Sequence, residues 1–199
     1  MIPPAVSTHV RTLDRDAAAP ARHFAFVSGN ETHKNLWRLH EIARCAVRRG
    51  FCDFTFHLTV TRDAYLQRLG ARQHDLQLID RHFDFIGPTS PREIMRVYEN
   101  ADCVVSLSDL ESFSNNYMEA WKVGLPLIVS DRDFARAICG TSALYVDPHD
   151  PQSVFAALLQ LHADTALRRR LVAEGMRRLA ELPSVAHRTS LILAELDAA

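Results

Sequence analysis

The 199-residue chain lacks an excess of charge of either sign and a long apolar run. Its formal net charge is −1, which gives no reason to expect nucleic acid or an anionic membrane as a partner. No apolar stretch approaches the length that spans a bilayer. The N-terminus also lacks the basic and apolar regions of a signal peptide. These absences favour a cytoplasmic protein.

Patterns typical of metal sites and disulfides are missing too. The ten histidines show no HxH or HxxxH spacing, so no histidine metal site is expected. No CxxC pair is present, and we expect reduced, mostly buried thiols at the four cysteines, Cys45, Cys52, Cys103 and Cys139. Lysine is nearly absent, because 21 arginines accompany only Lys34 and Lys122. A genome rich in G and C explains this bias, and against it Lys34 is a candidate functional cation.

Short apolar strands alternate with amphipathic helices along the chain. Residues 1–21 lack periodicity and are predicted to be a linker or tail, which leaves one domain over residues 22–199. The expected strands are 23–27, 54–60, 83–87, 103–107, 127–129 and 144–146. The expected helices are 34–49, a helix that begins at Ser90, and 150–161, with further helical residues to the C-terminus. The alternation predicts an α/β, Rossmann-like fold: a parallel sheet flanked by helices on both faces.

Two polar segments follow strands and should therefore lie at the ligand-binding edge of the sheet. The first is the turn 28–34, and the second is the run 108–126, which contains Glu111 and Glu119. A helix N-terminus in the second segment attracts phosphate, whereas carboxylates accept hydrogen bonds from hydroxyls. A ligand that carries both groups, such as a sugar nucleotide, satisfies this combination.

The same residues resemble a known family, the retaining glycosyltransferases of family 4, which have the two-domain GT-B fold. The resemblance covers residues from about 22 to 182 and falls on the family's C-terminal, donor-binding half. The motifs that carry it are His33-Lys34-Asn35-Leu36, Glu111 and Glu119 with seven residues between them, Gly124-Leu125-Pro126, Ser130-Asp131, and the run from Leu144 to Asp150.

The resemblance implies a role for each matched position. Lys34 would neutralise charge on the nucleotide diphosphate, Glu119 would bridge the ribose hydroxyls, and Glu111 would face the hydroxyls of the transferred sugar. Sugar or phosphate would also meet the backbone of Phe113, Ser114 and Asn115. The family needs no metal and no other cofactor, so the DxD-like run Asp131-Arg132-Asp133 is expected to be a simple turn.

The chain departs from the family pattern in its loops. Ser112 and Ser114 stand where many relatives have glycine, and the arginine that often begins the phosphate turn is missing. Gly29 and His33 remain in that turn as donor-binding candidates, and Arg62, which follows the second strand, is a candidate substitute cation. Phe113 and Tyr117 are equally compatible with packing, and Asn115 and Asn116 with helix capping. The arginines 168–170, 177 and 178 are expected on a solvated helix face.

The resemblance predicts the donor domain of a hexosyltransferase, with an N-terminal acceptor domain absent from this chain. The segment 2–6 resembles the family's interdomain linker. The expected donor is a UDP-, GDP- or ADP-sugar, and the expected acceptor is a glycan or lipid-linked glycan of bacterial polysaccharide synthesis. Peripheral contact of the full enzyme with the cytosolic face of the inner membrane fits that acceptor. The alternatives are a non-catalytic sugar-nucleotide-binding module or half of a split enzyme; a sugar-nucleotide 2-epimerase fits less well.

Overall fold

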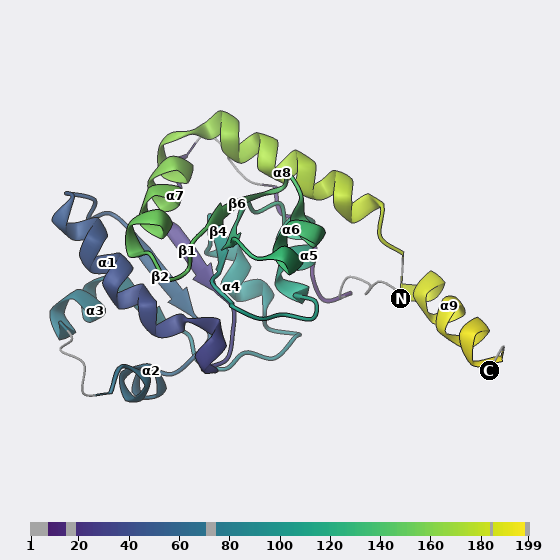
Figure 1. Cartoon of the computed structure of the whole chain (residues 1–199), viewed down its shortest axis with the longest axis horizontal. Helices are drawn as coiled ribbons and strands as arrows, with labels where there is room; N and C mark the ends of the chain where they lie inside the picture. Colours follow the sequence, from purple (N-terminus) through teal and green to yellow (C-terminus); the bar gives the residue numbers. More distant parts are fainter. Residues whose placement is uncertain (1–7, 15–18, 71–74, 184, 198–199) are drawn as a thin grey trace.

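The sheet has six parallel strands in the order β3-β2-β1-β4-β5-β6 (Figure 1). The computed structural model describes residues 8–14, 19–70, 75–183 and 185–197. Its strands are β1 His23–Phe26, β2 Thr55–Leu58, β3 Phe83–Phe85, β4 Cys103–Ser106, β5 Leu127–Ser130 and β6 Ala143–Val146. Each was predicted within one or two residues of its ends, and the predicted α/β, Rossmann-like fold is confirmed.

Helices cover both faces of the sheet (Figure 1). They are α1 Leu39–Arg48, α2 Arg62–Leu69, α3 Leu76–His82, α4 Met95–Glu99, α5 Asn115–Val123, α6 Asp133–Cys139, α7 Pro151–Ala163, α8 Thr165–Ala180 and α9 Val185–Asp197. Side chains of a strand alternate between faces, so Phe24 and Phe26 enter one buried cluster with α1, α2, α3 and α7. Ala25 enters the other cluster with α4, α5 and α6. Within the described residues, no helix is both long and apolar enough to cross a membrane.

The helix predicted over residues 34–49 starts later than expected. Two 3₁₀ turns, η1 Thr32–Lys34 and η2 Leu36–Arg38, precede α1. Asn35 between them has a left-handed backbone with φ of 56°, a conformation that asparagine tolerates better than most residues and that interrupts a helix. The helix expected to open at Ser90 also starts later: Ser90 Oγ donates to Glu93 Oε2 at 2.6 Å, but α4 begins only at Met95.

The described part of the N-terminal segment packs on the domain without forming a helix or strand. Val10 is buried in the cluster that contains α4 and α5. The N–H of Leu13 donates to the carbonyl of Val123 at 3.1 Å, and Arg11 pairs with Glu99 at 2.6 Å. The linker-like run 2–6 lies outside the described residues.

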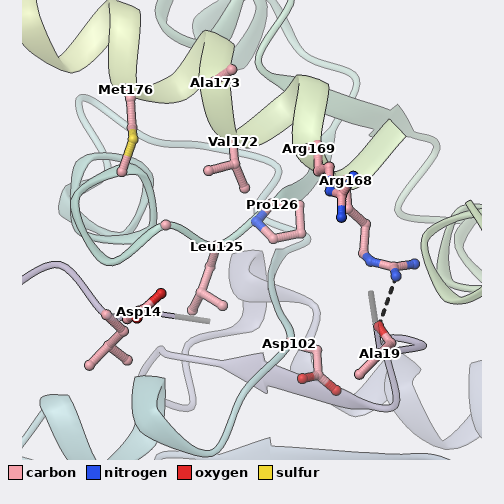
Figure 2. Close-up of a pocket in the computed structure, with 12 residues that line it drawn as sticks. Asp14, Ala19, Asp102, Leu125, Pro126, Arg168, Arg169, Val172, Ala173 and Met176 are labelled. Atoms are coloured by element: carbon pink, nitrogen blue, oxygen red, sulfur yellow. Dashed lines mark hydrogen bonds between the residues drawn. The ribbon is translucent and has the colours of Figure 1, made fainter. Parts of the chain in front are cut away.

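Arg168 corrects the expectation of a fully solvated arginine face on α8. Its side chain is buried, and its guanidinium donates to the carbonyls of Ala19 and His162 at 2.8 and 3.1 Å and to that of Leu161. Figure 2 shows this arginine turned toward Ala19, at a cavity of about 370 Å³ below the amino-terminal ends of β4 and β5. Arg168 therefore ties α8 to the segment that leads into β1.

Candidate active site

A cleft of about 500 Å³ opens at the carboxyl-terminal edge of the sheet. The chain runs outward from β1 through β2 to β3 and then returns to β4 on the other side of β1, so the direction in which strands are added reverses between β1 and β4. Such a switch point is where open α/β sheets bind ligands. The cleft is lined by Val27 to Asn30, Thr59 to Thr61, Ala64, Pro88, Thr89, Ile94 and Asn116.

Lys34 and Glu111 meet at the same edge of the sheet, on the loops after β1 and β4, although neither lines the cleft. The ammonium of Lys34 pairs with Glu111 Oε1, and the hydroxyl of Ser108 donates to the same oxygen at 2.8 Å. The side chains are only 20% and 12% exposed. The two loops are joined again by the N–H of Asp109, which donates to the carbonyl of His33 at 2.8 Å. The tertiary structure thus brings together the two predicted catalytic residues, 77 positions apart in sequence.

Glu119 lies one turn into α5 and is bound by a residue that the sequence did not single out for the site. The hydroxyl of Tyr98 on α4 donates to Glu119 Oε2 at 2.7 Å. Burial raises the pKa of Glu119 above its ordinary value, and the hydrogen bond from Tyr98 opposes that rise. The helical spacing of Tyr98 with Ile94 and Val97 predicted only an apolar face.

The start of α5 is built without side-chain capping. Ser114 is the N-cap residue, with φ of −93° and no side-chain cap bond, and Asn115 is the first helical residue. Asn116 instead donates its amide to the carbonyl of Val27 at 2.5 Å, which joins α5 to the end of β1 across the switch point. Phe113 packs against the core of that side. Because Asn35 alone among the described non-glycine residues has positive φ, the serines in place of glycine need no strained backbone.

The turn 28–34 is contacted by an arginine that the sequence did not single out. Gly29 lines the cleft and His33 is exposed, but the guanidinium of Arg62 pairs with Asp80 at 2.8 Å. Arg68, further along α2, donates to the carbonyl of Asn30 and, at 3.0 Å, to the hydroxyl of Thr32. Among 21 arginines, nothing in the sequence marked Arg68.

A polar network around Asp109 was also missed. Its carboxylate accepts from Asn35, Arg132 and His149 at 2.7, 2.7 and 2.9 Å. Burial opposes ionisation of Asp109, but these hydrogen bonds hold its pKa below the usual range. The network joins the loops after β4, β5 and β6. Through Asn35 it also holds these loops next to Lys34, the preceding residue in the chain.

Two residues of the DxD-like run, Asp131 and Arg132, form ion pairs with other side chains. Arg132 binds Asp109, and Asp131 pairs with Arg136 on α6 at 2.5 Å. Over the described ranges, no group of three or more histidine, cysteine, aspartate or glutamate side chains is arranged to hold a metal ion.

Comparison with known proteins identifies the family. Residues 21–164 match the protein family described as glycosyl transferases group 1. The chain belongs to this family. Two D-inositol 3-phosphate glycosyltransferases are similar to it: that of Corynebacterium urealyticum is 36% identical over 88 residues, and that of Corynebacterium jeikeium is 38% identical over 106 residues. The matches cover 43% and 52% of this chain but only 21% and 25% of those glycosyltransferases.

Solved glycosyltransferase structures share the fold over nearly the whole chain. Sucrose-phosphate synthase from Thermosynechococcus elongatus superposes with a TM-score of 0.76 at 19% identity, over 98% of this chain and 52% of that one. A mutant of S. aureus TarM, solved with fondaparinux, α-GlcNAc-glycerol and UDP, superposes with a TM-score of 0.77 at 17% identity, over 98% of this chain and 38% of that one. The chain therefore spans about half or less of the length of these structures.

Proposed function

We propose that this chain is the donor-binding, C-terminal half of a family 4 retaining hexosyltransferase. The observation that carries the proposal is the contact of Lys34 with Glu111 at the sheet edge where the cleft opens. A cation, a carboxylate and the N-terminus of α5 all follow strands at that edge, which suits a ligand with phosphates and hydroxyls. The donor is a UDP-, GDP- or ADP-sugar. Uridine nucleotides are the first to test, because a structural neighbour was solved with UDP.

The diphosphate would lie over the turn 28–34 and the start of α5. The backbone N–H groups of Phe113, Ser114 and Asn115 at the N-terminus of α5 favour an anion through the helix dipole. Lys34 neutralises the charge that develops on the leaving diphosphate, and Arg68 replaces Arg62 as the second cation of the turn. Fixed positive groups at a leaving group supply much of the rate enhancement in such sites. This arrangement requires no metal.

The sugar and the ribose would be held by the two glutamates. Glu111 accepts from hydroxyls of the transferred hexose, and Glu119 accepts from the ribose hydroxyls. The base enters the part of the cleft lined by Pro88, Thr89 and Ile94. An acceptor domain outside this sequence completes the cleft and binds a glycan or lipid-linked acceptor. We place the full enzyme in the cytoplasm, in contact with the inner membrane where such an acceptor resides.

The test is calorimetric titration of the chain with UDP, GDP and ADP. One nucleotide is expected to bind, and Glu119→Ala and Lys34→Ala are each expected to weaken it about tenfold, the usual effect of losing one hydrogen bond to a charged group. Arg62→Ala is the matched control, because its guanidinium is paired with Asp80 away from the turn. If no nucleotide binds, or if both site variants bind as the wild type does, the proposal is wrong.

A second candidate is a sugar-nucleotide-binding module without catalysis, or one half of a split enzyme. It is favoured by the partial coverage, since the chain matches 52% of the synthase and 38% of TarM. Incubation with radiolabelled sugar nucleotide, alone and with a co-expressed acceptor domain of a relative, separates a catalytic chain, fused or split, from the binding module. Transfer that appears on addition of the acceptor domain supports the enzyme or the split enzyme, whereas binding without transfer or hydrolysis supports the module.

A further inference from the structure

Tyr98 is a buried tyrosine whose hydroxyl binds a carboxylate of the proposed donor site. Its side chain is fully buried among apolar residues of α4 and α5. The hydroxyl donates to Glu119 Oε2 at 2.7 Å. A phenylalanine would fill the same apolar space, so packing alone does not explain the hydroxyl.

A carboxylate that binds a ribose must hold one orientation. Glutamate has three rotatable side-chain bonds, and fixing them on binding costs free energy. A hydrogen bond from a rigid, buried ring to one carboxylate oxygen fixes them before the ligand arrives. The remaining lone pairs of the carboxylate stay available, since it accepts up to about four hydrogen bonds.

We propose that Tyr98 is a positioning residue that holds Glu119 in the orientation that accepts the 2′- and 3′-hydroxyls of a ribonucleotide. The inference rests on the proposed function, because it takes Glu119 as the ribose acceptor. It adds that the selection of ribonucleotides over deoxyribonucleotides at this site depends on the hydroxyl of Tyr98. Tyr98 itself touches neither the nucleotide nor the reacting atoms.

The electrostatics of the pair favour this role. Burial raises the pKa of Tyr98 well above its ordinary value, and the charge of Glu119 raises it further, so the hydroxyl keeps its proton at neutral pH. Burial also raises the pKa of Glu119, while Tyr98 lowers it. The other charged groups close by in sequence are Lys122, three residues along α5, and Arg96 and Glu99, which flank Tyr98 on α4. Removal of the hydroxyl should raise the pKa of Glu119 and so favour its protonation.

The decisive variant is Tyr98→Phe, which keeps the ring and removes the hydroxyl. Wild type, Tyr98→Phe and the control Tyr65→Phe, a buried tyrosine of the opposite core cluster, are titrated with UDP and with 2′-deoxy-UDP. Tyr98→Phe is expected to lose roughly tenfold in affinity for UDP and only about threefold for 2′-deoxy-UDP, which keeps the 3′-hydroxyl contact alone. Tyr65→Phe is expected to keep the wild-type preference.

The pH profile provides a readout that a purely structural role would not move. The wild-type affinity for UDP falls on acidification as Glu119 becomes protonated, and in Tyr98→Phe this fall should begin at higher pH. Glu119→Asp is the second variant, because it keeps the charge but withdraws the carboxylate from the hydroxyl. The same loss of ribose preference is expected.

Several outcomes would overturn the inference while leaving the proposed function in place. They are an equal loss for both nucleotides in Tyr98→Phe, an unchanged UDP affinity, or full ribose preference in Glu119→Asp. A wild type that binds neither nucleotide contradicts the proposed function itself, and the inference with it. Circular dichroism and thermal melting of each variant identify any variant that fails to fold, and the affinities of the other variant then decide the question.

Discussion

Lys34 and Glu111 form an ion pair across two loops, one after β1 and one after β4. Each is the other's partner in the structure, although one is proposed to meet the diphosphate and the other the sugar. Both side chains are largely shielded from water, so neither charge is left uncompensated before the donor binds. If Lys34 meets the diphosphate as proposed, its ammonium exchanges the Glu111 carboxylate for a phosphate or shares its three donors between them.

This exchange predicts opposite effects for free nucleotide and for sugar nucleotide. Glu111→Gln removes the competing charge, so the affinity for UDP should rise about two- to tenfold. The loss of a charged acceptor should at the same time abolish the extra affinity of the UDP-sugar over UDP. Competition titrations with both ligands measure this, with Glu41→Gln at an exposed position of α1 as the control. A fall in UDP affinity would contradict the exchange.

Arg68 and Arg62 offer a matched pair on α2. Arg68→Met should weaken UDP binding about tenfold but uridine binding hardly at all, because it removes a cation from the phosphate turn. Arg62→Met should change neither, since its guanidinium faces Asp80. The salt dependence of UDP binding should also become shallower in Arg68→Met alone. If UDP binding weakens in Arg62→Met and not in Arg68→Met, the cation of the turn is Arg62, as the sequence predicted.

Glu119 is expected to limit stability at neutral and alkaline pH. Its folded-state pKa is raised, chiefly by burial, so the protein gains stability from this carboxyl below its unfolded pKa and loses it as pH rises through the folded pKa. Glu119→Gln keeps an acceptor for Tyr98 and removes the charge. Its Tm should equal that of wild type near about pH 4 and exceed it near about pH 8. A Tm difference that does not grow with pH would contradict this assignment.

Gly175 on α8 faces Trp121 on α5 too closely for any side chain. A Cβ at Gly175 would lie 2.2 Å from Cδ1 of the indole. Gly175→Ala should therefore destabilise the fold by about 1–3 kcal/mol through overpacking, although alanine is the better helix former. Urea denaturation measures this. Trp121→Phe in the same chain should recover part of the loss, and Ala166→Gly at an exposed position reports ordinary helix propensity on α8.

The buried Arg168 should be far more costly to remove than its exposed neighbour. Arg168→Met leaves the carbonyls of Ala19, Leu161 and His162 without this donor, which should cost about 2–4 kcal/mol. Arg170→Met, at an exposed position on the same helix, should change stability by less than about 0.5 kcal/mol. Equal effects in denaturant titrations would show that the contacts of Arg168 contribute no net stability.

Local patterns were sufficient for the fold. Strands such as 103–106 are buried on both faces and appear as continuous apolar runs, and a parallel sheet covered by helices is the usual way to bury them. Where prediction failed, a long-range or conformational effect decided the outcome. The left-handed Asn35 delayed α1, and nothing in the helical pattern of residues 34–49 reveals that conformation.

The site was predictable only where a motif carried it. Lys34, Glu111 and Glu119 stand in ordered, spaced motifs, so their sequence context alone marked them. Arg68 and Tyr98 stand in no motif; they reach the site because α2 and α4 fold against the turn after β1 and against α5. Their side chains are indistinguishable by sequence from an ordinary surface arginine and an ordinary core tyrosine.

Short-range patterns in the chain were thus enough to specify a Rossmann-like sheet with its candidate residues on the carboxyl edge, because strand periodicity and loop position depend on residues close together in sequence. Which side chains meet at that edge depended on the folded molecule. The Lys34–Glu111 pair, the Tyr98–Glu119 hydrogen bond and the contact of Arg68 with Asn30 each join residues on different elements. Such contacts follow from how helices pack on the sheet, and packing is a property of the whole chain.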